Sequence, residues 1–485
     1  MDQKLKEIDK YITRLHAIAS RSSKAGKLDK ALAAIGAVSS IQYSINQTYT
    51  DDLAEEILKY NSAQIKLPNE YCVNDDTVLF YDGFGLDLRG WAASFVKGIV
   101  DAGFTIIYIT KEDAKGHIPH IEHEVGKGKG RIEYVNINHS YITSASILNS
   151  FFLQYRPKTA FLYTYPSDVS AVLVFDAYDG LVQRIQIDLT DHAFWLGSKA
   201  FDYITESRIL GASNAVYHRG VSKEKIQKMD CCLYINSDMD EAPLPFDIYS
   251  EKYIFSGGAL YKTLGDKEHL YYKIIDIVLN NNKDVRFLYA GNGDDTELKK
   301  LIDSYPDRAF HIPERPDFYR LFENCLFFLN TYPMFGGLMM RFAANAGKIP
   351  LTLKHDSDHS GILIGQDTLG ITFDTLEEIV AEANRLIRDE DYRRSKESKL
   401  KSAVLSQSEF AVILRRLITE GNTGDSFMDI PEIETLEFRK EYLNRLDIDE
   451  LLLKAIPTKL NKSLLASFPR LFIQKAVRRI KHDKF

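Results

Sequence analysis

The stretch 326–350, LFFLNTYPMFGGLMMRFAANAGKIP, contains the pattern of a strand, a turn and the start of a helix. Leu326 to Leu329 form a short apolar run of strand length. Apolar residues then recur at helical spacing just beyond the pair Gly336 and Gly337. Glycine lets the backbone approach a ligand closely, and a helix N-terminus presents free N–H groups that suit a phosphate. The stretch therefore predicts either an ordinary βα turn in a buried sheet or a phosphate-binding loop, and its neighbours decide between them.

Four other segments after residue 252 also predict a strand followed by a loop, and four of the five strands end in a glycine or polar loop. They are YIFSGGALYKT at 253–263, VRFLYAGNGDD at 285–295, AFHIPERPDF at 309–318 and IPLTLKHDSDHSG at 349–361. The first is expected to open a basic helix at its end. The carboxyl ends of parallel strands meet at one edge of a sheet, so these loops should converge there. This repetition favours phosphate binding, with Lys262 as a point charge and Asn292 serving a sugar hydroxyl.

A similar series precedes it, beginning with a buried strand at 77–83, TVLFYDG. A loop at 84–90, an amphipathic helix at 91–103 closed by Gly103, and a strand at 104–110 complete a βαβ unit. The loop lies where open α/β sheets bind ligands. Its candidate site residues are Asp82, Phe84, Gly85 and Arg89, with a plain solvent loop as the alternative. Further short strands are expected at 132–136, 159–163, 171–175 and 183–188.

The segment 184–197, RIQIDLTDHAFWLG, ends a strand in a polar cluster followed by aromatic residues. His192 beside Asp191 is what a general base needs, because a carboxylate can orient an imidazole that titrates near neutral pH. Trp195 would supply an aromatic wall for a sugar. The alternative is a helix N-cap made by Thr190 or Asp191, with His192 exposed in the first turn. Further on, 204–221 predicts a helix and then a short strand ending in Tyr217, His218 and Arg219.

The chain divides by pattern into four parts. Residues 1–65 have helical periodicity and predict a small helical cap for packing or oligomerisation. The segment 238–252, DMDEAPLPFDIYSEK, is acidic, carries two prolines and lacks periodicity, as a linker does. We therefore expect a cap at 1–65, one α/β domain at 66–240, a second at 253–420 and a helical tail at 421–485.

Composition excludes several classes of protein. A chain of 485 residues is too long for one core, and a net charge of −7 argues against a general nucleic-acid binder. The N-terminus is charged, and no apolar run approaches the roughly 20 residues of a membrane span. Four cysteines without zinc spacing fit reduced thiols. These features predict a cytoplasmic protein.

Two further segments carry their own predictions. His117, His120 and His123 are expected in a surface loop rather than a metal site, because Pro119 should break helical geometry. The segment 470–484, RLFIQKAVRRIKHDK, separates on a helical wheel into an apolar face and a basic one. That composition suits a helix lying in an anionic membrane surface, with a terminal helix docked on the protein as the alternative.

Two α/β domains, a proline-bearing linker and glycine loops in the second domain resemble the GT-B architecture of nucleotide-sugar glycosyltransferases over roughly 70–420. FSGGALYK at 255–262, FLYAGNG at 287–293, NTYPMFGG at 330–337 and AGKIP at 346–350 look like that fold's successive donor-domain segments. DLTDHAFWLG at 188–197 resembles the histidine-bearing segment of bacterial members and of relatives of protein O- and N-glucosyl or N-acetylglucosaminyl transferases.

The resemblance implies two Rossmann-like domains facing a cleft, the first taking the acceptor and the second the donor. It makes His192 and Asp191 the catalytic candidates and puts Trp195 with the acceptor-side residues above. The implied donor-binding residues are Ser256, Gly257, Gly258, Tyr261, Lys262, Gly291, Asn292, His311, Pro333, Met334, Phe335, Gly336, Gly337 and Leu338.

One departure concerns the Glu-x7-Glu pattern of many retaining members of glycosyltransferase family four. Residues 333–344 contain no glutamate, which leaves the ribose contact and the stereochemistry open.

The resemblance implies a metal-independent transferase of a sugar from a nucleoside diphosphate to a cell-envelope glycan precursor or a protein hydroxyl, with no cofactor. A GT-B epimerase that acts on the nucleotide sugar alone is one alternative. The other is an inactive GT-B-like partner subunit of a true transferase, which the missing glutamates favour slightly.

Overall fold

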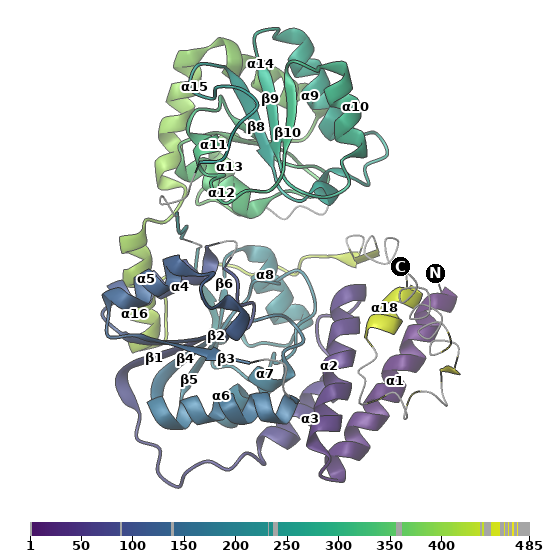
Figure 1. Cartoon of the computed structure of the whole chain (residues 1–485), viewed down its shortest axis with the longest axis vertical. Helices are drawn as coiled ribbons and strands as arrows, with labels where there is room; N and C mark the ends of the chain where they lie inside the picture. The colour runs from purple at the N-terminus through teal and green to yellow at the C-terminus, as the bar shows by residue number, and fades with distance from the viewer. Residues whose placement is uncertain are drawn as a thin grey trace. The chain divides into compact units, whose positions relative to one another are not determined.

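The computed structural model describes residues 2–87, 90–136, 140–230, 232–235, 241–355, 361–436, 439–440 and 448–455, and positions 460, 464, 468–469 and 473. The chain forms two compact units (Figure 1). The first comprises Met1–Asp87, Phe95–Met229 and Ala411–Phe485, and the second comprises Leu88–Ser94 and Asp230–Phe410. Each unit is built on one parallel sheet.

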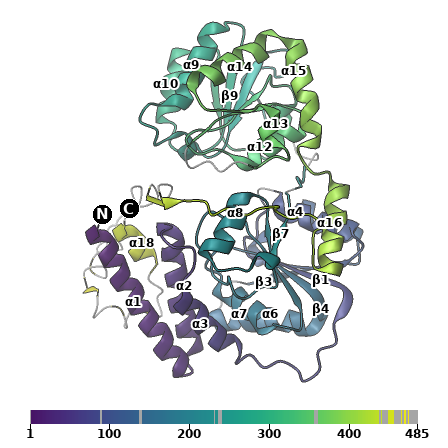
Figure 2. The same ribbon diagram turned by 180° about the vertical axis from the view of Figure 1, so that it is seen from behind.

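The first unit begins with three helices, where the sequence predicted a small helical cap. They are α1 (Asp2–Lys24), α2 (Leu28–Ile45) and α3 (Asp52–Ser62). Gly26 lies between α1 and α2 with a φ of +68°, a left-handed conformation that glycine adopts without strain. Both views show the three helices grouped beside α7 (Val169–Ala177), which α2 and α3 contact (Figures 1 and 2). The three helices therefore share one apolar core with the sheet domain.

The sheet of the first unit has seven parallel strands in the order β3-β2-β1-β4-β5-β6-β7. Their bounds are β1 Asn74–Asp82, β2 Thr105–Lys111, β3 Arg131–Val135, β4 Pro157–Tyr163, β5 Gln183–Ile187, β6 Tyr203–Glu206 and β7 Ile226–Lys228. The remaining helices are α4 Trp91–Asp101, α5 Pro119–Lys127, α6 Tyr141–Tyr155, α8 Ile209–Ser213, α16 Gln407–Glu420 and α18 Ile448–Lys454. The first residues of two of them, 91–94 of α4 and 407–410 of α16, belong to the second unit. The order reverses between β1 and β4, which is the switch point of a doubly wound sheet.

Helix α7 corrects one prediction, because a strand was expected at 171–175. All but one of its nine residues are buried, and the side chain of Asp168 caps it by accepting from the backbone N–H of Ala171 at 3.2 Å. A helix buried on every side has no polar stripe, so its sequence looks like a buried strand.

A second correction concerns residues 214–219, where a short strand was expected. Residues Asn214–His218 form one turn of π-helix directly after α8, and Arg219 ends it. The strand of this region is β6, which ends at Glu206. The polar residues at the end of the strand are therefore Glu206 and its successors, and Tyr217 to Arg219 belong to the helical return.

The second unit has six parallel strands in the order β10-β9-β8-β11-β12-β13. Their bounds are β8 Tyr253–Gly257, β9 Arg286–Ala290, β10 Ala309–Ile312, β11 Phe328–Leu329, β12 Pro350–Leu353 and β13 Thr372–Phe373. Its helices are α9 Leu270–Asn281, α10 Thr296–Ser304, α11 Arg320–Glu323, α12 Gly337–Asn345, α13 Gln366–Leu369, α14 Leu376–Arg388 and α15 Glu390–Glu397. The order reverses between β8 and β11, so the loops after these two strands flank the switch point.

The helix expected to open at the end of 253–263 is shorter than predicted. Residues Leu260–Thr263 form one 3-10 turn, and the α-helix begins only at Leu270. Asp266 causes this delay, because its carboxylate accepts from the backbone N–H groups of Glu268 and Leu270. Lys262 therefore belongs to a tight loop.

Two expectations concern membranes. None of the helices that the structure describes is both long and apolar enough to cross a bilayer. The amphipathic segment 470–484 lies outside the described residues, apart from position 473.

Candidate functional site

The loop after β11 is shaped by one buried amide side chain. Asn330 Oδ1 accepts from the backbone N–H groups of Thr331 at 3.0 Å and Gly336 at 2.8 Å, while its Nδ2 donates to Thr352 Oγ1 at 3.2 Å. The hydroxyl of Thr331 donates to the carbonyl of Met334 at 2.6 Å. These bonds close residues 331–336 into a compact turn, after which α12 begins at Gly337. Its first N–H groups therefore point to the carboxyl edge of the sheet.

The loops after β8 and β9 approach each other through glycines. A Cβ atom on Gly291 would lie 1.9 Å from the carbonyl oxygen of Gly258, so position 291 cannot carry a side chain with this backbone. Gly258 has a φ of +132°, a value that favours glycine, and no atom lies within 4 Å of the position its Cβ would take. Its backbone N–H donates to Ala290, and Tyr289 donates to its carbonyl at 3.0 Å. The space beside Gly258 is thus left open by a rigid backbone.

Hydrogen bonds bring the predicted donor-binding segments together. The backbone N–H of Met334 donates to the carbonyl of Lys262 at 3.2 Å, and that of Leu260 donates to the carbonyl of Asn292 at 2.9 Å. His311 Nε2 lies 2.8 Å from the carbonyl oxygen of Gly291. Loops 257–262, 291–293 and 330–337 therefore form one surface at the switch point, with Lys262 half-buried within it.

Ser256 and Tyr261 have different surroundings although both were assigned to the donor. Ser256 is fully buried, and its hydroxyl lies 2.6 Å from that of Tyr271. Tyr261 is 54% exposed. Ser256 therefore fixes the strand beneath the loop, and Tyr261 is on the surface.

Asp82 shapes the loop that follows β1 in the first unit. Its Oδ1 accepts from the backbone N–H groups of Phe84 at 2.9 Å and Gly85 at 3.0 Å, and its Oδ2 accepts from the hydroxyl of Tyr108 at 2.5 Å. Burial raises the pKa of Asp82 to about 6. Phe84 packs on the ring of Tyr163. Arg89 lies outside the described residues.

The catalytic candidates lie in the loop after β5. Arg208 donates to both oxygens of Asp191, at 2.5 and 2.7 Å, and Nδ1 of His192 lies 3.3 Å from Asp191 Oδ1. Burial favours the neutral carboxyl, yet the charge and hydrogen bonds of Arg208 hold the pKa of Asp191 well below its ordinary value. The side chain of His192 is 30% exposed. The structure thus places a partly exposed imidazole against a carboxylate that stays ionised.

Trp195 and Arg219 support this loop from the interior of the first unit. The indole N–H of Trp195 donates to Asp188 at 2.8 Å, and its ring, 2% exposed, lies 4.8 Å from the guanidinium of Arg219. Arg219 Nη2 donates to the carbonyls of Asp191 at 3.3 Å and Ala193 at 2.6 Å. Arg219 therefore supports the backbone that carries His192.

A second carboxyl group, Glu206, is buried beside Asp188. Burial, and then the negative charge of Asp188, raise the pKa of Glu206 well above its ordinary value. Arg219 Nη1 lies 3.8 Å from Asp188 Oδ2. Burial and the neighbouring Asp188 carboxyl therefore both favour the neutral form of Glu206, and Arg219 opposes them. A Cβ atom on Gly211 would lie 2.0 Å from Glu206 Oε2, so Gly211 makes room for this side chain.

The sequence analysis gave no role in the site to four residues that hold the His192 loop from elsewhere in the first unit: Arg208, Arg219, Asn214 and Asn46. Asn214 Nδ2 donates to the carbonyl of Asp191 at 2.9 Å. Asn46 Nδ2, at the end of α2, donates to the carbonyl of His192 at 3.1 Å. No motif links these positions, because they meet only when the strands and the N-terminal helices pack. The one signal was the density of polar residues in 204–221.

Of the three histidines predicted in a loop, His117 lies in the turn before α5, whereas His120 and His123 lie in the helix itself. Helix α5 begins at Pro119, which suits the first position of a helix because that position needs no intrahelical N–H bond. His120 Nε2 lies 3.6 Å from Asp87 Oδ2, and His117 and His123 are exposed. Among the residues that the structure describes, no group of three or more histidine, cysteine, aspartate or glutamate residues is placed to hold a metal ion.

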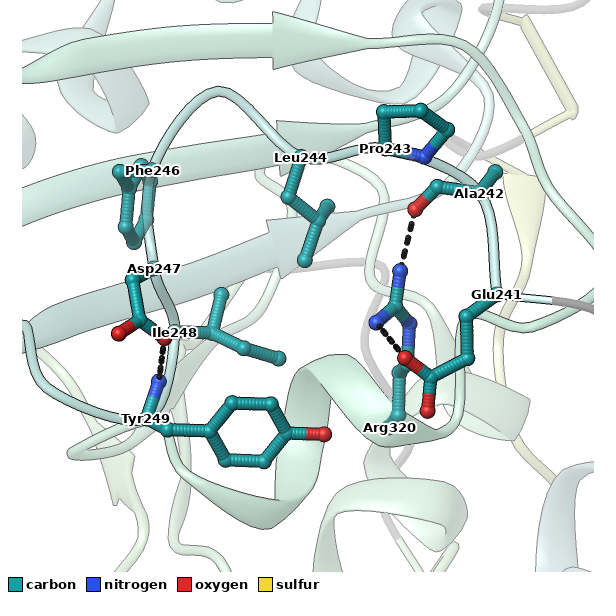
Figure 3. Close-up of a pocket in the computed structure, with 9 residues that line it drawn as sticks. All are labelled: Glu241, Ala242, Pro243, Leu244, Phe246, Asp247, Ile248, Tyr249 and Arg320. Atoms are coloured by element: carbon teal, nitrogen blue, oxygen red, sulfur yellow. Dashed lines mark hydrogen bonds and ion pairs between the residues drawn. The ribbon is translucent and has the colours of Figure 1, made fainter.

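A hollow of about 430 Å³ lies on the second unit, outside the loops above (Figure 3). Arg320 closes one side by donating to Glu241 at 2.7 Å and to the carbonyl of Ala242. Leu244, Ile248 and Tyr249 line the other side, and Tyr249 is 64% exposed. This hollow is open and shallow, and none of its residues was predicted to bind a ligand.

Comparisons with known proteins give the fold. No protein-family model matches the sequence, and a search of curated proteins gives no match. A solved structure from Listeria monocytogenes described as a UDP-N-acetylglucosamine 2-epimerase has a TM-score of 0.52 at 10% identity, covering 73% of this chain and 100% of its own. An O-GlcNAc transferase mutant from Thermobaculum terrenum has a TM-score of 0.51 at 14% identity, covering 84% of this chain and 82% of its own.

A further UDP-N-acetylglucosamine 2-epimerase has a TM-score of 0.51 at 12% identity, covering 74% of this chain and 100% of its own. Likeness at such identities concerns the fold. Together with the two parallel doubly wound sheets and the N-terminal helices, it confirms the predicted architecture. The chain has the GT-B-like α/β fold that glycosyltransferases share with UDP-N-acetylglucosamine 2-epimerases.

Proposed function

We propose that this protein is a glycosyltransferase that moves a sugar from a nucleoside diphosphate to a hydroxyl of a cell-envelope glycan precursor or a protein. The observation that carries the proposal is the single surface formed by loops 257–262, 291–293 and 330–337 at the switch point of the second sheet. Its glycines leave backbone open to a ligand, and Asn330 fixes its geometry before any ligand binds.

The donor diphosphate binds at the N-terminus of α12, with Lys262 as its counter-charge. The N–H groups of the first helical turn have no intrahelical partner and carry a partial positive charge, which suits phosphate oxygens. Lys262 is tied to this turn through the bond from Met334 to its carbonyl. These groups meet the phosphate charge without a metal ion, so chelators should leave activity intact.

His192 acts as general base on the acceptor. Its Nδ1 faces the ionised Asp191, which favours a proton on Nδ1 and leaves Nε2 to accept the hydroxyl proton of the acceptor. As that proton transfers, the acceptor oxygen forms a bond to the anomeric carbon. The bond between this carbon and the phosphate oxygen breaks, and its electron pair leaves with the nucleoside diphosphate.

An epimerase is the second candidate, because two of the three neighbours described above are UDP-N-acetylglucosamine 2-epimerases. Such an enzyme needs the donor surface and no acceptor. Inversion at C2 breaks the C2–H bond, so the product formed in D₂O would carry deuterium at C2. A GT-B-like partner subunit without activity is the third candidate and would neither transfer nor exchange.

The experiment that separates them uses the whole purified chain and a panel of nucleotide sugars, with UDP-N-acetylglucosamine first because the neighbours' names include it. Slow release of free sugar and UDP without a change at C2 supports the transferase. Deuterium at C2 of the recovered nucleotide sugar supports the epimerase. Nucleotide binding without turnover, or no binding at all, contradicts both enzymes.

A further inference from the structure

We propose that the N-terminal helices are part of the catalytic apparatus, with Asn46 as a positioning residue that holds the His192 loop in its working conformation. This inference rests on the proposed function. It gives α2 and α3 a role that their sequence, predicted to serve packing or oligomerisation, did not indicate.

Asn46 is placed to make this contact by the end of α2. It is the C-cap residue, in a left-handed conformation with a φ of 47°, and its backbone N–H donates to the carbonyl of Gln42. Asparagine tolerates this conformation better than most side chains. Asn46 is fully buried, and its Nδ2 donates to the carbonyl of His192 at 3.1 Å.

The bond completes a series of three. The carbonyl of Asp191 accepts from Asn214 and Arg219, and that of Ala193 accepts from Arg219. The carbonyl of His192, between them, accepts from Asn46. Three consecutive peptide groups are thus fixed by side chains, and the central one is held from the N-terminal helices.

Two further contacts join the N-terminal segment to this loop and to Arg219, which supports the loop. Glu55 Oε1, on α3, accepts from the backbone N–H groups of Gly197 at 2.7 Å and Ser198 at 3.2 Å. Tyr49 lies between α2 and α3, and its ring is 5.2 Å from the guanidinium of Arg219. Arg219 therefore lies against Tyr49 as well as Trp195.

The imidazole of His192 is carried by the peptide group that Asn46 holds, so a shift of this backbone moves the ring. Its Nδ1 lies 3.3 Å from Asp191 Oδ1. A general base must lie within hydrogen-bond reach of the proton it removes, and small displacements lower the rate steeply.

Asn46→Gly tests the proposal because glycine keeps the left-handed backbone and removes the side chain that carries the amide donor. Arg156→Gly is a matched control: Arg156 caps α6 with the same φ of 47°, and its side chain is exposed. We expect Asn46→Gly to lower kcat by roughly 10- to 100-fold while KM for the donor stays unchanged, and Arg156→Gly to leave both as in the parent.

Hydrogen exchange gives a second measurement that does not need activity. Loss of one buried hydrogen bond should speed amide exchange in residues 190–198 about fivefold, the factor that corresponds to about 1 kcal/mol. Unchanged exchange there overturns the proposal, as does faster exchange with an unchanged kcat. If the parent protein has no transferase activity, the proposed function fails, and exchange alone decides whether Asn46 holds the loop.

Discussion

Glu55 should make the attachment of the N-terminal helices depend on pH, and replacing it by glutamine should remove that dependence. Its side chain is buried against Gly197 and Ser198, and burial raises its pKa to about 7 from an ordinary value of 4.5. The folded protein therefore holds this proton over a pH range in which the unfolded chain has released it. The contribution of Glu55 to the stability of the folded protein is complete below about pH 4.5 and is lost as the pH rises through 7.

The magnitude follows from these two values. Their difference is 7 − 4.5 = 2.5 pKa units. At about 1.36 kcal/mol per unit, the free energy of unfolding is lower by about 3 kcal/mol above pH 7 than at acidic pH. Between pH 5 and pH 7 the group should lower the free energy of unfolding by about 2 kcal/mol. Glutamine keeps an oxygen that accepts from both backbone N–H groups and cannot ionise. Glu55→Gln should therefore gain about 2 kcal/mol relative to the parent across this interval.

The assay is urea unfolding followed by the fluorescence of Trp195, which lies in the first unit. The chain has only one other tryptophan, so a Trp91→Phe background makes the signal specific. Glu56→Gln, one residue along α3 and exposed, is the control. Parallel pH curves for the parent and Glu55→Gln, or an equal gain in Glu56→Gln, would refute the reasoning.

His192→Ala should lower turnover by about 100-fold or more with donor binding retained, because only the proton acceptor is lost. The control His123→Ala, at an exposed position, should have no effect. Equal turnover in the two variants would exclude His192 as the general base. Lys262→Ala should weaken the binding of UDP by about 1.5–3 kcal/mol in calorimetry, the range for a charged hydrogen bond, whereas Lys267→Ala should not; equal affinities would remove Lys262 from the donor site. Residues 470–484 are proposed to hold the enzyme at the inner face of the cell membrane, with each basic residue contributing about 1 kcal/mol to the free energy of membrane binding. A chain ending at Ser467 should therefore no longer sediment with anionic vesicles, yet it should keep activity on a soluble acceptor. If the full chain also ignores such vesicles, a soluble protein is the better candidate for acceptor.

Five of the six strands of the second unit could be predicted from local pattern. Four of these five end in a glycine or polar loop, a signal carried by consecutive residues. Two features were not predicted: strand β13, and the late start of the helix after Lys262, which Asp266 postpones by capping a later turn. The sequence could not predict that position 291 requires glycine, because this requirement comes from the carbonyl of Gly258 in another loop.

The first unit was harder to predict because its contacts are distant in sequence. His192 and Asp191 are adjacent and formed a visible motif, whereas Asn46 lies 146 residues before the carbonyl it holds. Helix α7 was missed for a related reason, since the N-terminal helices cover the face that would otherwise be polar. Periodicity records exposure to water, and it fails where a second layer of protein removes that exposure.

The contact between Gly211 and Glu206 predicts how this protein can vary among its homologues. A Cβ at position 211 would lie 2.0 Å from Glu206 Oε2 and 2.9 Å from Asp191 Cβ, so alanine at 211 requires the glutamate side chain to move. A shorter residue at 206 would remove the contact with Glu206 and leave the weaker one with Asp191 Cβ at 2.9 Å. The two positions should therefore covary, with glycine at 211 wherever 206 is glutamate or glutamine and larger residues at 211 only where 206 is small.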